Sequence, residues 1–393
     1  MQALINSAET ALLRQLRSDF LSMFGQDCRI FRAPGRVNLI GEHTDYNDGL
    51  VMPAAIDFAT FVAAAPSPRP ELTANSRQQQ KTAAFILDAA APAPSRDWTD
   101  YVRGVSLQLQ LSGFVLTGAN LLVDSRVPIG AGLSSSAALE VGTALALIDL
   151  AKADIEPNAL ARLCQRAENE FVGARCGIMD QFASVHGRAG HAMLLDCRSL
   201  EMRYVPLPDS LRLVICNTTV KHALSAGEYN TRRAECESAV QYFARFRPGI
   251  RALRDVNDDD LRRYGPDLPQ VLFRRARHVV TENARVLKTA EALEHGNLRE
   301  VGRLMYDSHI SLRDDYEVSC PELDIMVEIA RQIPGVIGAR MTGGGFGGCT
   351  VNLIELEAIP ELTRRVRNEY HSATQIKPEI YVTSAASGAG RVI

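Results

Sequence analysis

The feature that most constrains the fold of this chain is the stretch 137–152, which is apolar on almost every face. Only a helix that is buried on all sides carries such a pattern. The helix follows a Gly- and Ser-rich segment, 127–136, and that segment follows an apolar strand predicted at 119–123. A strand that passes through a loop of small residues into a buried helix predicts a layered domain with a large core.

The rest of the chain alternates between strands and helices, and we find no internal repeat of solenoid period. We predict further strands at 28–32, 58–65, 211–217, 336–340, 349–356 and 379–383. We predict further helices over the first twenty-odd residues, at 97–111, 157–172, 228–246, 270–295, 298–314 and 360–370, and one that begins at Pro321. The Ala- and Pro-rich stretch 88–95 is interpreted as a surface loop and not as an interdomain linker. The pattern predicts an α+β protein with two mixed lobes.

The composition is that of an ordinary globular protein, with 46% hydrophobic and 23% charged residues. Lys and Arg (43) nearly balance Asp and Glu (46), which gives a net charge of −3. This balance provides no electrostatic reason to bind nucleic acid or an anionic membrane. We therefore expect a small-molecule partner.

Eight cysteines are scattered without a C-x-x-C pair, which argues against a structural zinc site and a thioredoxin-like motif. The opening helix carries Glu9 and Asp19, so it lacks the uncharged core of a signal peptide. The most apolar stretch, 51–65, is interrupted by Pro53 and Asp57 and is too short to span a bilayer. We expect a cytoplasmic protein.

Segment 33–49 places Arg36, Glu42, His43 and Asp45 among glycines. Glu42, His43 and Asp45 bring three hydrogen-bonding groups into one short loop, which suits a ligand with several hydroxyls, such as a sugar. The residues alone leave two alternatives, a polar surface turn or a metal cluster built on His43 and Asp45. One histidine and two carboxylates on a flexible loop are a weak signal for a transition metal.

Segment 130–136 reads Gly-Ala-Gly-Leu-Ser-Ser-Ser and directly precedes the buried helix. Small residues let the backbone approach a ligand, and the N–H groups at a helix N-terminus attract an anion such as a nucleotide phosphate. The segment is not a P-loop, because the lysine of that motif is absent. Helix capping is the alternative, but a single serine would satisfy it. We therefore favour phosphate binding.

Segment 341–348 contains five glycines and formally matches G-x-G-x-x-G. A dinucleotide site needs a helix after those glycines, whereas 349–356 has the alternation of a strand. The segment is therefore either a hairpin turn or a place where a ligand lies against bare backbone.

Asp180 is the only acidic residue of segment 177–187. A buried carboxylate stays ionised when a cation such as an arginine lies beside it. A lone aspartate of this kind is more often a helix cap or a hydrogen-bond acceptor than a base. Glu168, on the preceding predicted helix, would by itself be assigned to a solvated helix face.

In this order, the four segments resemble those of the galactokinases, a group of the GHMP small-molecule kinases. The first is similar to the galactokinase signature, with every polar position present. The similarity extends to 128–140, 166–187, 229–233, 308–324 and 340–349, and so covers essentially the whole chain. It implies an N-terminal lobe at 1–207, similar to the second domain of ribosomal protein S5. A ferredoxin-like lobe would follow at 208–393, with the active site between the two.

The resemblance also implies a role for each motif residue. Arg36 would stabilise the transition state, and Asp180 would accept the proton of the attacking hydroxyl. The sugar would be held by Glu42, His43, Thr44, Asp45 and Tyr229. The ATP phosphates would be held by Gly130, Ala131, Gly132, Leu133, Ser134, Ser135 and Ser136. Mg²⁺ would be coordinated by Ser136 and Glu168.

The implied reaction transfers the γ-phosphate of ATP to the C1 hydroxyl of α-D-galactose, a step of galactose metabolism. Such a transfer needs positioning and charge neutralisation more than covalent catalysis. Two alternatives stay open: a kinase for a related sugar, such as N-acetylgalactosamine or L-arabinose, and a noncatalytic sensor of galactose and ATP. A sensor would have a damaged phosphate loop, whereas segment 132–138 is intact. We expect a monomer.

Overall fold

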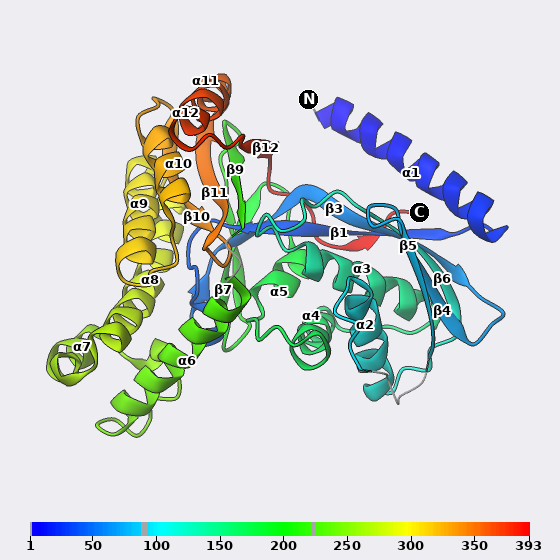
Figure 1. Ribbon diagram of the computed structural model, residues 1–393, viewed down its shortest axis with the longest axis horizontal. Helices are drawn as coiled ribbons and strands as arrows, with labels where there is room; N and C mark the ends of the chain where they lie inside the picture. Colours follow the sequence, from blue (N-terminus) through cyan, green and yellow to red (C-terminus); the bar gives the residue numbers. More distant parts are fainter. Residues whose placement is uncertain (1, 88–92, 222–224) are drawn as a thin grey trace.

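A computed structural model describes residues 2–87, 93–221 and 225–393. The α+β class predicted from the sequence is confirmed, because the described residues form three sheets covered by helices (Figure 1). Most of the Ala- and Pro-rich stretch 88–95, interpreted above as a surface loop, lies outside the described residues.

The largest sheet has six strands in the order β13-β1-β3-β6-β4-β5, and only its β4–β6 pair is parallel. Its strands are β1 (Arg29–Asn38), β3 (Pro53–Pro66), β4 (Glu71–Ser76), β5 (Lys81–Ile86), β6 (Ala119–Ser125) and β13 (Gly390–Arg391). Since β13 lies beside β1, the end of the chain returns to the sheet built by its beginning (Figure 1).

Helices cover both faces of this sheet, with α1 on one face and the others on the opposite face (Figure 1). They are α1 (Gln2–Phe24), α2 (Thr99–Leu111), α3 (Ser135–Leu150), α4 (Pro157–Arg166), its π-helical continuation η2 (Ala167–Val172), and α5 (Met179–His186). The helix predicted to be buried on all sides is α3, which packs against β1 and β3.

The side chains of β3 alternate between these two layers, as the period of a strand requires. Val62 and Ala64 pack into the cluster formed with α2, α3 and α4. Phe61 and Ala63 point the other way and pack with Phe20 of α1. The sheet is therefore buried on both faces, which is why β3 reads as a nearly continuous apolar run.

A second sheet has four antiparallel strands in the order β10-β11-β9-β12. Its strands are β9 (Leu211–Lys221), β10 (Val336–Thr342), β11 (Gly347–Glu355) and β12 (Glu379–Thr383). The helices of this half are α6 (Ser225–Ala244), α7 (Asp258–Tyr264), α8 (Gln270–Glu294), α9 (Leu298–Asp314), α10 (Pro321–Arg331), α11 (Ile359–Arg365) and α12 (His371–Thr374). Leu213 and Val351 of this sheet share one core cluster with Val37 and Met52, so the two halves of the chain are joined by apolar packing.

A third sheet, β2-β7-β8, was not predicted from the sequence. Its strands are β2 (Leu50–Val51), β7 (His191–Asp196) and β8 (Met202–Pro206). The remaining short helical segments are η1 (Asp45–Asn47), η3 (Leu253–Asp255), η4 (Gly265–Asp267), η5 (Leu356–Ala358) and η6 (Val366–Tyr370).

The strand predicted at 28–32 is too short, since β1 continues to Asn38. Pro34 and Gly35 indicate a turn in the sequence, but in the structure they mark a register shift between β1 and β3. Bulges are where a sheet tolerates proline. Arg36 therefore lies on a strand, and not on a flexible loop.

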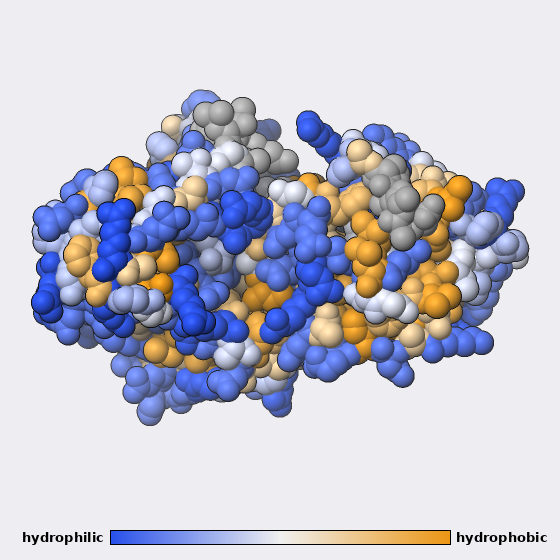
Figure 2. Space-filling view, turned by 90° about the horizontal axis from the view of Figure 1, so that it is seen from below, coloured by the Kyte–Doolittle hydropathy of each residue, from blue (hydrophilic) through white to orange (hydrophobic). Residues whose placement is uncertain are grey.

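Figure 2 shows one face of the molecule, on which hydrophilic residues spread over both ends and hydrophobic residues gather in small groups between them. Among the helices of the described residues, none combines the length and the apolar character needed to cross a membrane.

Candidate active site

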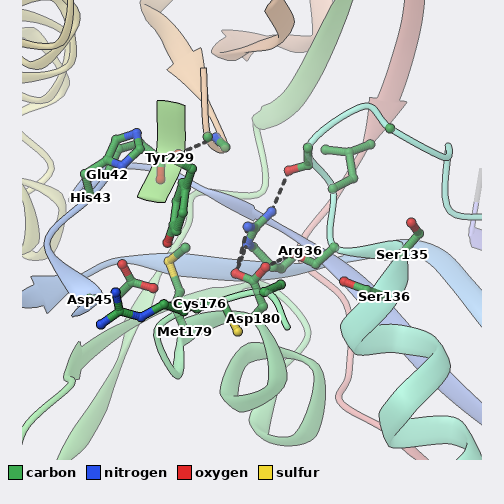
Figure 3. Close-up of a pocket in the computed structure, with 18 of the residues that line it drawn as sticks. Arg36, Glu42, His43, Asp45, Ser135, Ser136, Cys176, Met179, Asp180 and Tyr229 are labelled. Carbon is green, nitrogen blue, oxygen red and sulfur yellow. Dashed lines mark hydrogen bonds and ion pairs between the residues drawn. The ribbon is translucent and has the colours of Figure 1, made fainter. Parts of the chain in front are cut away.

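A cavity of about 570 Å³ lies where β1, the start of α3, α5, α6 and the β10–β11 hairpin meet. Figure 3 shows side chains from these separate elements around it. The cavity brings together these residues predicted from the sequence: Arg36, Glu42, His43, Asp45, Gly130, Gly132, Leu133, Ser134, Ser135, Ser136, Asp180 and Tyr229. The backbone of the predicted glycine loop reaches the cavity at Gly343 and Gly344. The four motif segments, which are far apart in the sequence, thus line one site together with Tyr229 of α6.

Arg36 and Asp180 form an ion pair at the centre of this cavity (Figure 3). The Nε and Nη2 atoms of Arg36 lie 2.9 and 2.7 Å from Oδ1 of Asp180. Nη1 of Arg36 donates to the carbonyl oxygen of Gly132 at 2.6 Å. The Arg36 side chain is 6% exposed and that of Asp180 is 24% exposed, so the carboxylate is the more accessible partner. A cation and a carboxylate can therefore act on the same reacting group.

The Gly- and Ser-rich segment 130–136 is predicted to bind phosphate, so we call it the phosphate loop. It ends in the first turn of α3. Ser134 is the N-cap residue, but its hydroxyl donates to Oδ2 of Asp180 at 2.5 Å instead of capping the helix. Gly130 and Gly132 have positive φ angles of 72° and 70°, which glycine adopts readily. Helix capping therefore does not explain the serines, and the first turn of α3 is left facing the cavity, where it can bind an anion.

Residues 39–50 include the side chains that the sequence predicts to bind a sugar, so we call them the sugar loop. Glu42 connects this loop to the β10–β11 hairpin. Oε1 of Glu42 accepts from Oγ1 of Thr342 at 2.9 Å and from the N–H of Gly343 at 2.7 Å. Oε2 accepts from Nδ2 of Asn38 at 3.1 Å. Glu42 is only 2% exposed. It belongs to a buried network and not to the polar surface turn considered above.

His43 and Tyr229 form a wall of the cavity, with ring centroids 5.7 Å apart. Nδ1 of His43 lies 2.9 Å from the hydroxyl of Tyr46. Burial, followed by the positive charges nearby, lowers the pKa of His43 to about 3. The imidazole is therefore neutral at physiological pH, so it can orient a hydroxyl without adding charge.

Asp45 lies in the short helical segment η1 and points into the same cavity (Figure 3). Burial, followed by the charge of Asp180, raises its pKa from 3.8 to about 7. The room for Asp45 comes from a glycine, because a Cβ at Gly177 would lie 2.0 Å from Oδ2 of Asp45. Gly177 is thus required for this position of the carboxylate.

Two of the predicted binding residues lie behind the cavity wall. Thr44 is fully buried, and its hydroxyl lies 2.8 Å from the carbonyl oxygen of Gly41 and 2.7 Å from that of Leu50. Ala131 is buried in the core that joins the two halves of the chain. Thr44 closes the neck of the sugar loop, and Ala131 supports the phosphate loop from beneath.

Comparisons with known proteins identify the family. Residues 18–66 match the galactokinase galactose-binding signature, residues 100–188 the N-terminal domain of GHMP kinases, and residues 289–372 their C-terminal domain. The chain is 48% identical over 380 residues to a galactokinase from Roseiflexus sp. (strain RS-1), covering 96% of this chain and 97% of that protein. It belongs to the galactokinase family. As a member of this family, the chain is an ATP-dependent kinase.

Solved structures agree with this assignment. The crystal structure of Lactococcus lactis galactokinase complexed with galactose matches with a TM-score of 0.93 and 35% identity, over 97% of this chain and 100% of that one. The mevalonate kinase of Methanococcus jannaschii matches with a TM-score of 0.65 and 18% identity, over 92% and 99%, which indicates the shared fold alone. The two-lobed GHMP kinase fold predicted from the sequence is thereby confirmed. The boundary at 207/208 stays a prediction.

In this galactokinase-family chain, Glu168 is buried at 7% exposure and does not lie on a solvated face. The π-helical turn of η2 directs it inward, where it accepts from Nε2 of Gln181 at 2.6 Å and from the hydroxyl of Ser136. Burial, followed by neighbouring carboxylates, raises the pKa of Glu168 and of Glu140 beside it. One oxygen of Glu140 is buried without a hydrogen-bond partner. These neighbouring oxygen atoms are ligands of the kind that a hard divalent cation prefers.

No group of three or more His, Cys, Asp or Glu residues is arranged to hold a metal ion in the part of the chain that the structure describes. This argues against the metal cluster considered for His43 and Asp45. A Mg²⁺ ion at Ser136 and Glu168 would therefore take its other ligands from water and from phosphate oxygens, as Mg²⁺ commonly does.

A second, smaller cavity of about 160 Å³ adjoins the phosphate loop and shares Ser135 and Ser136 with the first. Its apolar lining includes Trp98, Tyr101 and Ile129. Sequence reasoning missed these residues, because they come from segments without a motif. Their only signal is a pair of aromatic residues near the start of α2.

Proposed function

We propose that this enzyme phosphorylates galactose, converting ATP and α-D-galactose to ADP and galactose 1-phosphate. The observation that carries the proposal is the Arg36–Asp180 ion pair, which lies between the sugar loop and the phosphate loop in one cavity. A solved galactokinase with galactose bound matches nearly the whole chain and supports this choice of sugar.

The sugar would lie against the sugar loop. Asp45 would accept hydrogen bonds from sugar hydroxyls, and neutral His43 would orient another hydroxyl. The ring of Tyr229 would provide an apolar wall. Glu42 would act mainly by fixing the glycine hairpin, because its oxygens already accept three hydrogen bonds within the protein.

ATP would lie along the phosphate loop, with its phosphates at the N-terminus of α3. The backbone N–H groups of that first turn attract negative charge. The base would enter the smaller cavity, where Trp98 and Tyr101 offer aromatic surface. Because Ser135 and Ser136 line both cavities, one nucleotide can occupy both.

The transfer would need one base and a set of positive charges. Asp180 would accept the proton of the C1 hydroxyl, whose oxygen forms a bond to the γ-phosphorus while the bond to the bridging oxygen of ADP breaks. Arg36 would orient Asp180 and offset the charge on the transferred group. Ser136 and Glu168 would hold Mg²⁺, which neutralises phosphate charge when bound.

A coupled ADP-release assay across several acceptors tests the proposal. We expect turnover with galactose to exceed by far that with N-acetylgalactosamine, L-arabinose, glucose and mevalonate. Phosphate on C1 of the product would be identified by phosphorus NMR. Higher kcat/KM for any other acceptor would overturn the assignment of galactose.

We also propose that the enzyme is a cytoplasmic monomer. Cell fractionation tests the location, and light scattering after size exclusion tests the monomer.

A further inference from the structure

The sugar loop is hydrogen-bonded to α8, a helix that begins more than two hundred positions after the loop in the sequence. We propose that three polar side chains of α8, His278, Glu282 and Asn283, are positioning residues that hold the sugar loop in its binding shape. The loop carries His43 and Asp45, so its shape sets where the sugar hydroxyls meet their partners. The expected effect on sugar affinity rests on the proposed function, whereas the hydrogen bonds between α8 and the loop do not.

Two of these side chains hold the backbone at the start of the loop. Oε1 of Glu282 accepts from the N–H of Gly41 at 2.9 Å. Nε2 of His278 lies 3.1 Å from the carbonyl oxygen of Glu42 and donates to it. The peptide group before Gly41 and the peptide group after Glu42 are thus fixed by adjacent turns of one helix.

The third side chain holds the end of the loop. Oδ1 of Asn283 accepts from the N–H of Leu50 at 2.8 Å. This approach depends on Gly49, because a Cβ there would lie 2.6 Å from Oδ1 of Asn283. Both ends of the sugar loop are therefore attached to the same rigid helix.

Glu282 is itself held firmly. It is fully buried, and it accepts from Oγ of Ser308 and from Nε of Arg285, each at 2.6 Å. Burial would raise its pKa, but the positive charge of Arg285 and its other partners lower the pKa to about 2. The carboxylate therefore stays ionised and keeps accepting from the loop at any pH at which the enzyme works.

His278 has an equally fixed state. It is fully buried, and Nδ1 lies 2.9 Å from the hydroxyl of Ser311. Burial lowers its pKa to about 4. The carbonyl oxygen of Glu42 can only accept, so the neutral ring carries its proton at Nε2 and leaves Nδ1 as the acceptor that faces Ser311.

The experiment compares Glu282→Gln and Asn283→Leu with Asn283→Asp, which keeps an oxygen acceptor at the same place. Thr289→Val is the matched control, because Thr289 is fully buried on the same helix but donates to Arg285 within that helix. For each variant, calorimetry measures galactose and ATP affinity, and kinetics measures kcat and KM. Hydrogen exchange is followed at the N–H groups of Gly41 and Leu50.

A glutamine at 282 has a single oxygen, and when that oxygen faces Nε of Arg285, its amide N–H groups face the N–H of Gly41. We therefore expect Glu282→Gln and Asn283→Leu each to lose a hydrogen bond to the loop and to weaken galactose binding by about tenfold. ATP affinity should stay within about twofold, and KM for galactose should change more than kcat. Exchange at Gly41 should accelerate in Glu282→Gln, and exchange at Leu50 in Asn283→Leu. Asn283→Asp and Thr289→Val should resemble the wild type.

Two results would overturn the proposal. Unchanged exchange at Gly41 and Leu50 would show that α8 does not hold the loop. Equal loss of galactose and ATP affinity would show a general destabilisation instead of a local effect. If the wild-type enzyme does not bind galactose, the proposed function is wrong. Hydrogen exchange at Gly41 and Leu50 still decides whether α8 holds the loop.

Discussion

The hydroxyl of Ser134 donates a hydrogen bond to Oδ2 of Asp180 at 2.5 Å, and this bond connects the phosphate loop directly to the proposed base. The other carboxylate oxygen, Oδ1, is held by Arg36. Both oxygens of Asp180 are therefore oriented before a substrate arrives. Such preorganisation lowers the cost of reaching a reactive geometry.

The first prediction concerns Asp180→Asn. The amide keeps the size of the side chain but cannot take a proton. We expect kcat to fall by about 10² to 10⁴, because general base catalysis contributes about that much. Affinities for ATP and galactose, measured by calorimetry, should stay close to those of the wild type. Turnover near the wild-type value would show that positioning alone drives the transfer.

The motifs could be found from the sequence because their polar residues cluster within a few positions, as Arg36, Glu42, His43 and Asp45 do. Residues that act from regular elements could not be found this way. Glu282 is one of many polar residues on α8, and no pattern in the sequence shows that tertiary packing buries it. Glu168 looked solvated because an α-helical period was assumed, whereas a π-helical turn changes its direction.

The fold was predictable to a similar extent. The buried helix at 137–152 corresponds to α3, because a run that is apolar all round has few other solutions. In the third sheet, β2 was missed since it has only two residues. Such strands are defined by their partners in space and leave little pattern in the sequence.

The second prediction concerns the proposed magnesium ligands. Ser136→Ala and Glu168→Gln each remove an oxygen donor of the kind that Mg²⁺ prefers. We expect each variant to need about tenfold or more Mg²⁺ for half-maximal turnover. Galactose affinity in the absence of Mg²⁺ serves as the control and should not change. An identical Mg²⁺ titration in wild type and both variants would exclude these residues from the metal site.

The third prediction concerns Asp45 and the pH dependence of stability. In the folded protein the pKa of Asp45 is raised from 3.8 to about 7. A raised carboxyl pKa means that the folded state loses stability as pH rises from about 4 to about 7. Asp45→Asn removes this loss.

Thermal unfolding without galactose tests whether ionisation of Asp45 destabilises the folded protein. The unfolding midpoint of Asp45→Asn should equal that of the wild type at pH 4. Above pH 7 the variant should unfold about 2 °C or more higher than the wild type. A difference that stays constant from pH 4 to pH 8 would show that Asp45 is not destabilised by ionisation in the folded protein.

The last prediction concerns Gly177, whose missing side chain makes room for Asp45. A Cβ at Gly177 would lie 2.0 Å from Oδ2 and 2.3 Å from Cγ of Asp45, so alanine must displace the carboxylate. We expect Gly177→Ala to weaken galactose binding by about tenfold or more, since a displaced acceptor leaves sugar hydroxyls unpaired. ATP affinity should change much less, because the phosphate loop lies on another segment.

Gly249→Ala is the matched control, because a Cβ at Gly249 would meet nothing within 4 Å. Both variants lose the same backbone freedom in the unfolded chain, so their difference reports the contact with Asp45. The double variant Gly177→Ala/Asp45→Ala separates this contact from other effects. If Gly177 acts through Asp45, adding Gly177→Ala to Asp45→Ala should cost little further galactose affinity. Additive losses in the double variant would show that Gly177 shapes the site independently of Asp45.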